Sequence, residues 1–247
     1  MATLILVRHG RTTANASGTL AGRTRGVGLD QTGLSQATRA GERLAGVPLA
    51  RVVTSPLERC RQTTRAILEA RGPEHASSAE GAALEVVTDK GLTECDYGEW
   101  QGRKIRELAK EKLWKTVQSQ PSAVVFPGGE SMPAMQARAI AAVRRHDAVV
   151  QAAHADAGIW LAVSHGDVIK SILADALGMH LDLFQRINVD PASISIIRYT
   201  EARPFVLATN THAGDLSWLA PKPKRGRRAR KSSGDAVVGG GAGPATA

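Results

Sequence analysis

The stretch Thr3-Leu4-Ile5-Leu6-Val7-Arg8-His9-Gly10 opens the chain with a β-branched and leucine-rich run that ends in an arginine, a histidine and a glycine. A short apolar run bounded in this way predicts a buried strand. In open α/β sheets, ligands bind beyond the carboxyl ends of the strands. His9 is therefore predicted to lie where a ligand would bind.

The rest of the chain alternates between strand and helix patterns. Strands are predicted at 51–54, 84–88 and 159–164, with 193–199 and 204–209 as a pair. Helices are predicted at 32–45, from Pro56 to about Ala70, at 103–117, after a Ser131 cap, and from 165 through Leu177 to a stop at Gly178. A surface loop is expected at 71–83. This alternation predicts an α/β three-layer sandwich, with a mostly parallel central sheet flanked by helices.

The positive charge is concentrated at one end. The formal net charge is +9, but seven basic residues lie between Lys222 and Lys231, and Asp235 is the one acid beyond residue 221. That segment therefore carries +6 and leaves +3 for residues 1–221. Its Pro, Lys, Arg, Gly and Ala show no apolar periodicity. We predict a catalytic domain at 1–220 and a basic, Gly/Ala-rich disordered tail at 221–247, suited at most to weak, nonspecific contact with anions.

Several classes of protein are disfavoured. No apolar run reaches the ~18 residues that a membrane helix needs, and the start of the chain lacks the basic segment and cleavage site of a secretory signal. Cys60 and Cys95 form no disulfide framework or metal-ligand motif. We expect a cytoplasmic protein without membrane contact.

Further motifs follow the Arg-His-Gly block in order. The quoted blocks are Arg8-His9-Gly10-Arg11-Thr12-x-x-Asn15, Leu29-x-x-x-Gly33-x-x-Gln36-Ala37, Ser55-Pro56-Leu57-x-Arg59-x-x-Gln62-Thr63, Leu92-x-Glu94-x-x-x-Gly98-x-Trp100-x-Gly102, Pro127-Gly128-Gly129-Glu130-Ser131 and Val163-Ser164-His165-Gly166. Together they resemble the histidine phosphatase superfamily, which includes the phosphoglycerate mutases. The resemblance spans roughly residues 3 to 212 and favours the phosphatase branch.

The resemblance implies a site without a metal or cofactor. His9 would carry a phosphohistidine, Arg8 and Arg59 would bind the phosphate, and His165 would donate to the transferred group. Glu94 would be the general acid, preferred by its position over Asp96 and Glu99. The substrate contacts would be Asn15, Ala21, Gly22 and Gly166. Related enzymes are often dimers, so a homodimer stays an open alternative for this chain.

These residue types suit phosphoryl transfer on physical grounds. Charge spreads over the equatorial oxygens in the transition state, and planar guanidinium groups can meet it with paired donors. A neutral imidazole is nucleophilic near neutral pH. Glu94 can deliver a proton near pH 7 only if its pKa is raised, for example by burial. His165 should be cationic if a bound phosphate favours its protonation.

Two other functions stay open. A 2,3-bisphosphoglycerate-dependent phosphoglycerate mutase would typically carry a longer insertion with paired arginines. Here 25 residues separate Gly102 from Gly128, without an Arg-Arg pair, although Lys110, Lys112 and Lys115 lie there. The second alternative is a non-catalytic anion-binding protein whose basic tail tethers it to nucleic acid. For a phosphatase, the substrate would be a small phosphorylated metabolite, and Arg23 and Arg25 point to an acidic one such as a sugar-acid phosphate.

Overall fold

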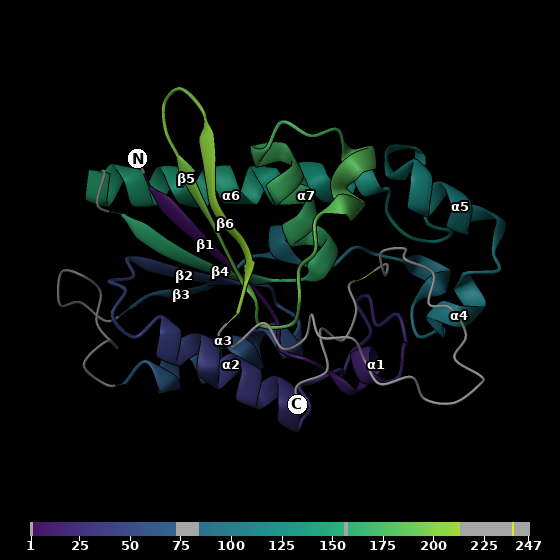
Figure 1. Cartoon of the computed structure of the whole chain (residues 1–247), viewed down its shortest axis with the longest axis horizontal. Coiled ribbons are helices and arrows are strands. Elements are labelled where there is room, and N and C mark those ends of the chain that lie inside the picture. Colours follow the sequence, from purple (N-terminus) through teal and green to yellow (C-terminus); the bar gives the residue numbers. More distant parts are fainter. Residues whose placement is uncertain (1, 73–83, 156–157, 213–238, 240–247) are drawn as a thin grey trace, which may run out of the picture.

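The computed structural model describes residues 2–72, 84–155, 158–212 and Gly239, and its centre is a six-stranded sheet (Figure 1). The strand order is β3-β2-β4-β1-β5-β6. The strands are β1 (Thr3–Arg8), β2 (Arg51–Thr54), β3 (Val86–Thr88), β4 (Ile159–Ser164), β5 (Ile194–Tyr199) and β6 (Pro204–Thr211). The first four run parallel, whereas β5 pairs antiparallel with β1, and β6 with β5. The sheet is therefore mixed, and the mostly parallel sheet predicted from the sequence is confirmed.

Helices cover both faces of the sheet (Figure 1). On one face lie α2 (Gln31–Arg43) and α3 (Glu58–Ala70), and on the other α6 (Met132–His154) and α7 (Gly166–Ala176). Along β1, Leu4 and Leu6 belong to one hydrophobic cluster, while Ile5 and Val7 belong to the other. A strand buried on both faces needs apolar residues at every position, which explains the unbroken run that opens the sequence. The predicted three-layer sandwich is confirmed.

Helix ends follow the capping residues. The Ser131 hydroxyl accepts the amide of Ala134 (3.2 Å) at the start of α6, as predicted. Gly178 follows α7 with φ of 66°, which stops that helix. The predicted start at Pro56 is two residues too early, because Leu57 has extended backbone and α3 begins at Glu58.

The single helix predicted at 103–117 is wrong. The segment forms two short helices, α4 (Ile105–Leu108) and α5 (Lys112–Ser119). In a continuous helix, Lys112 would lie on the same apolar face as Ile105 and Leu108. The break changes the direction of the second helix, so that Leu108 and Val117 both belong to one core cluster. The other short elements are α1 (Thr13–Ala16) and the 3-10 turns η2 (Lys90–Leu92), η3 (Gly98–Trp100), η4 (Pro121–Ala123) and η6 (Leu181–Arg186).

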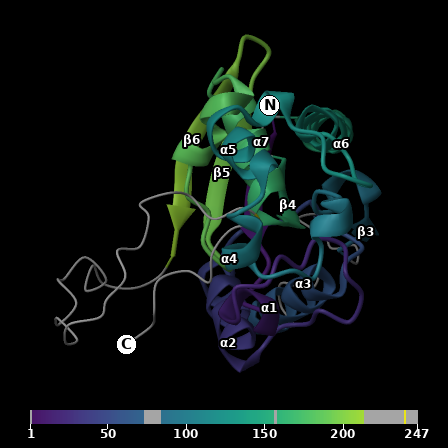
Figure 2. The same cartoon turned by 90° about the vertical axis from the view of Figure 1, so that its right-hand side faces the viewer.

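The helices α1, α4 and α5 lie together at one end of the molecule, beyond the carboxyl end of β1 (Figures 1 and 2). This is the end at which a ligand was expected. The predicted loop at 71–83 falls almost wholly outside the described residues, as does the predicted disordered tail at 221–247 apart from Gly239. Within the described residues, no helix has the length and apolar character to cross a bilayer.

Candidate active site

A cavity of about 470 Å³ opens at this end of the sheet. Six of the predicted site residues line it: His9, Asn15, Ala21, Gly22, Arg59 and Glu94. Arg8, His165 and Gly166 are buried beside these residues and do not form the cavity surface. The structure thus brings together side chains that are up to 157 positions apart in sequence, from Arg8 to His165.

Sheet pairing and one close backbone approach fix the turn after β1. The amide of His9 donates to the carbonyl of Ser164 (2.9 Å), so the first turn is tied to the end of β4. A Cβ on Gly10 would lie 2.3 Å from the carbonyl oxygen of Gly33, in the first turn of α2. Only glycine fits there, because backbone on both sides cannot move apart without displacing the helix.

His9 is held as a neutral imidazole. Its Nδ1 lies 2.7 Å from the carbonyl oxygen of Gly10, an acceptor, so Nδ1 carries the proton and Nε2 keeps its lone pair. Burial, with the positive charges of Arg59 and Arg8, holds the pKa of His9 well below its usual value. Nε2 is therefore available as a nucleophile at neutral pH.

The two arginines predicted to bind phosphate are buried with unused donors. Arg59 is 2% exposed, and its Nη2 donates to the carbonyl of Gly22 (2.7 Å). Arg8 is fully buried, its Nη1 donates to the carbonyl of Val189 (2.8 Å), and burial lowers its pKa. The Nε of each has no hydrogen-bond partner among the described residues. Buried guanidinium groups with unmet donors favour an anion as ligand.

His165 lies beside His9, with ring centroids 5.2 Å apart. Its Nε2 is 2.8 Å from the hydroxyl of Ser55, and the thiol of Cys60 is 3.4 Å from the same nitrogen. Burial and then the charges of Arg59 and Arg8 hold the pKa of His165 well below its usual value. Without a bound anion it is thus neutral, and the cationic form expected from the sequence requires the phosphate. The sequence did not identify Ser55 or Cys60 as partners of His165.

Glu94 is the acid of the three candidates that lines the cavity; Asp96 and Glu99 do not. The amide of Cys95 donates to its Oε1 (3.0 Å). Burial and then the charge of Asp167 raise the pKa of Glu94 to about 7, although Arg59 and Arg8 oppose the shift. At neutral pH, Glu94 therefore exists in both protonation states, as a general acid and base requires.

Two arginines clamp the backbone of Glu94. Its carbonyl oxygen accepts from Nε of Arg23 (2.9 Å) and Nη2 of Arg138 (3.1 Å). Both arginines pair with Glu130, at 2.8 and 2.6 Å. Arg23, interpreted from the sequence as a substrate contact, holds the backbone of Glu94 instead, and neither it nor the exposed Arg25 lines the cavity. Arg138 gave no sequence signal, because the Glu94 carbonyl that it binds lies 44 positions away in the chain.

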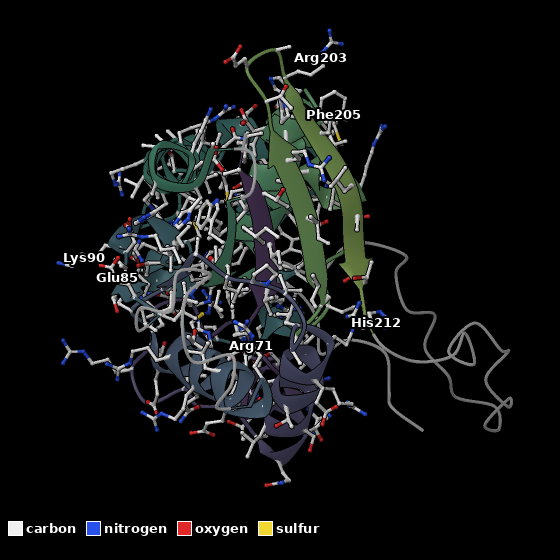
Figure 3. The ribbon with its side chains drawn as sticks, turned by 90° about the vertical axis from the view of Figure 1, so that its left-hand side faces the viewer. Arg71, Glu85, Lys90, Arg203, Phe205 and His212 are labelled. Carbon is white, nitrogen blue, oxygen red and sulfur yellow. The ribbon has the colours of Figure 1, made fainter. Side chains whose placement is uncertain are left out.

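The mouth of the cavity carries further polar groups. The side-chain oxygen of Asn15 accepts from the backbone amide (3.1 Å) and the hydroxyl (2.8 Å) of Thr12. The side-chain nitrogen Nδ2 of Asn15 is left to donate to a ligand. Lys104 and Arg106, near the start of α4, add cationic side chains that the sequence did not single out. His212 lies at the end of β6 (Figure 3), 3.6 Å from Asp190, and does not line the cavity.

Gly239 from the predicted tail also lines the cavity. Its carbonyl oxygen accepts from Nη2 of Arg8 (3.4 Å), and its amide donates to Oδ2 of Asp167 (3.0 Å). Its φ of 73° favours glycine. One residue of the tail thus occupies hydrogen-bonding groups of the site.

Comparisons with known proteins show which family this chain resembles. The Bifunctional protein Rv2228c of Mycobacterium tuberculosis is 32% identical over 202 residues, which are 79% of this chain and 50% of that protein; the chain thus spans about half of its length. The Probable phosphoglycerate mutase GpmB of Klebsiella pneumoniae is 31% identical over 227 residues, 89% of this chain and 95% of that protein.

Among solved structures, the α-ribazole phosphatase of Shigella flexneri matches with a TM-score of 0.70 and 26% identity, over 85% of this chain and 96% of that one. The family model of the histidine phosphatase superfamily (branch 1) matches residues 4–212. The chain therefore belongs to the histidine phosphatase superfamily, as its ordered motifs predicted.

Proposed function

We propose that this protein hydrolyses phosphomonoesters through a phosphohistidine on His9. The observation that carries the proposal is a neutral imidazole, its tautomer set by Gly10, beside two buried arginines with unused donors. The predicted enzyme class, phosphoric monoester hydrolase, agrees with the family and with the phosphatase name of the Shigella flexneri protein.

The chemistry proceeds in two steps. In the first, Nε2 of His9 attacks phosphorus, the bond from phosphorus to the ester oxygen breaks, and Glu94 gives its proton to the departing oxygen. In the second, ionised Glu94 takes a proton from water, whose oxygen attacks phosphorus, and the P–N bond breaks to release phosphate. Arg8, Arg59 and His165 stabilise the charge on the equatorial oxygens in both steps.

The substrate is a small phosphorylated metabolite. A cavity of about 470 Å³ suits a small molecule. Lys104 and Arg106 in its wall favour a further anionic group, which supports the sugar-acid phosphate considered from the sequence, or a sugar phosphate. We also propose a cytoplasmic location, because both described cysteines are free and buried.

A phosphoglycerate mutase is the second candidate, supported by the name of the Klebsiella pneumoniae relative. A mutase must protect phosphohistidine from water, and the cap of α4 and α5 is short. Incubation with 3-phosphoglycerate and a trace of 2,3-bisphosphoglycerate separates the two. Efficient formation of 2-phosphoglycerate without release of phosphate from any monoester would establish the mutase. A non-catalytic binding protein is disfavoured, since all five residues that the chemistry needs are present.

The direct test is to trap the intermediate. Rapid quenching during turnover of an aryl phosphate should give phosphate on His9 that is labile in acid and stable in base. His9→Ala should lose both the label and the turnover, while His180→Ala, an exposed histidine outside the cavity, should keep both. Normal phosphate release by His9→Ala would exclude the proposed mechanism.

A further inference from the structure

Asp167 is a buried carboxylate directly behind two residues of the cavity wall, Tyr97 and Gly239, and the proposed mechanism does not use it. It follows His165 and Gly166 in the first turn of α7 and is fully buried. Its Oδ2 accepts from the hydroxyl of Tyr97 (2.7 Å) and from the amide of Gly239 (3.0 Å). Both of these donors line the cavity, so Oδ2 is within reach of a molecule bound there.

The other oxygen of Asp167 has spare capacity. Oδ1 has no hydrogen-bond partner among the described residues. The Nζ of Lys170 is 3.8 Å away from it and donates to the side-chain oxygen of Gln185 (3.1 Å). Burying a carboxylate costs free energy, and leaving one of its oxygens unpaired adds to that cost. Such a group persists where function retains it.

Gly239 indicates which chemistry fits. Its carbonyl oxygen, on Nη2 of Arg8, stands in for an oxygen of the substrate phosphate, and its amide, on Oδ2 of Asp167, stands in for a donor elsewhere in the substrate. The two contacts belong to one residue, in which two atoms separate the nitrogen from the oxygen. A substrate would therefore need its donor close to the phosphate.

We propose that Asp167 selects phosphomonoesters whose leaving group carries an ammonium or hydroxyl donor within about three carbon atoms of the phosphate, with ammonium preferred. This inference rests on the proposed function and names its substrate class. The other carboxyl group at the cavity, Glu94, is occupied with proton transfer, and Arg59, Lys104 and Arg106 offer no acceptor. Hydroxyl and amide oxygens also line the cavity, but an ammonium group pairs best with a full negative charge, and Asp167 is the carboxylate left for it.

The test compares 2-aminoethyl, 2-hydroxyethyl and ethyl phosphate on the full chain. We expect kcat/KM to decrease in that order, with about tenfold or more between the first and the last. An ammonium group also improves the leaving group. The decisive quantity is therefore the ratio of kcat/KM for 2-aminoethyl phosphate to kcat/KM for ethyl phosphate, compared between the unmodified protein and Asp167→Asn. This variant keeps the shape of the side chain and loses its charge. The ratio should fall by about tenfold.

The matched control is Asp190→Asn. Asp190 is another carboxylate whose charge acts on Arg8, but its Oδ2 accepts from Asn188 (3.0 Å) and Asn210 (2.8 Å), and it does not line the cavity. Its substitution should leave the substrate ratio unchanged. A ratio that is the same in Asp167→Asn and in the unmodified protein, or equally reduced in both variants, would overturn the proposal.

A measurement on the unmodified protein covers the case in which Asp167→Asn fails to fold. Phosphocholine keeps the positive charge and the inductive effect but has no N–H donor. Its kcat/KM should fall at least tenfold below that of 2-aminoethyl phosphate, and equal values would overturn the proposal. Turnover of all these esters without discrimination would refute the role of Asp167 alone, whereas no turnover of any of them, or of aryl phosphates, would refute the proposed function.

Discussion

Replacing Glu94, the proposed general acid, should stabilise the protein at alkaline pH. Burial and the charge of Asp167 raise the pKa of Glu94 from 4.5 to about 7. Because the pKa is higher in the folded state, the folded protein binds this proton more tightly than the unfolded chain does. The associated stability is fully present below pH 4.5 and is lost as the pH rises through 7.

The size of the effect follows from the shift. The two pKa values differ by 2.5. At about 1.36 kcal/mol for a difference of one in pKa, ionisation of Glu94 lowers the free energy of unfolding by about 3 kcal/mol at pH 8. At pH 5 most of the difference has not yet developed. In Glu94→Gln the carboxyl group no longer ionises, and the amide oxygen still accepts from Cys95. The variant should therefore gain about 2.5 kcal/mol relative to the unmodified protein between pH 5 and pH 8.

Urea denaturation at several pH values measures this difference. Glu99→Gln, a carboxylate on the same loop outside the cavity, is the control and should show no such dependence on pH. The two proteins must be compared at the same salt concentration, because the arginines around Glu94 respond to bound anions. If the stability of Glu94→Gln relative to the unmodified protein stays constant between pH 5 and pH 8, burial does not disfavour the ionised form of Glu94 and the reasoning is refuted.

Three further outcomes are expected. Since protonated Glu94 acts as the acid, kcat/KM should decrease above about pH 7, and a profile flat to pH 9 would exclude it as the donor. Glu130→Gln weakens the clamp of Arg23 and Arg138 on the Glu94 backbone, so kcat should fall about tenfold with little change in KM; a change in KM alone would contradict this role. Deletion of 221–247 removes Gly239 from Arg8 and Asp167, so turnover of an aryl phosphate should persist with a lower KM, and loss of activity would place the domain edge elsewhere.

The sequence predicted those parts of the fold and site that rest on local patterns. The runs that became β1 and β4 were identifiable because strands buried on both faces are apolar throughout. His9 and His165 follow directly from these strands, so their placement required only the sheet rule. The break between α4 and α5 is not predictable from the sequence, because each half keeps a helical period of apolar residues. Only the position of the core determines where the apolar face of the second helix begins.

The supporting residues could not be predicted in this way. Arg138 holds Glu94 across 44 positions of sequence, and nothing near it marks that role. Arg23 has the charge expected of a substrate contact, and only its pairing with Glu130 shows otherwise. Asp167 reads as an ordinary acid in the first turn of a helix, where negative charge is favourable anyway.

The distance between the imidazoles of His9 and His165 is set by the pairing of two strands. Arg8 stands opposite Ser164 in the parallel register of β1 and β4, so the next residue of each strand is a histidine, and the rings are 5.2 Å apart. The pairing of two neighbouring parallel strands thus fixes the distance between the two rings, with room for a phosphoryl group beside His9 in the proposed mechanism. The pair is thus already assembled without a ligand, and a slip of either strand by one residue would turn its histidine to the opposite face.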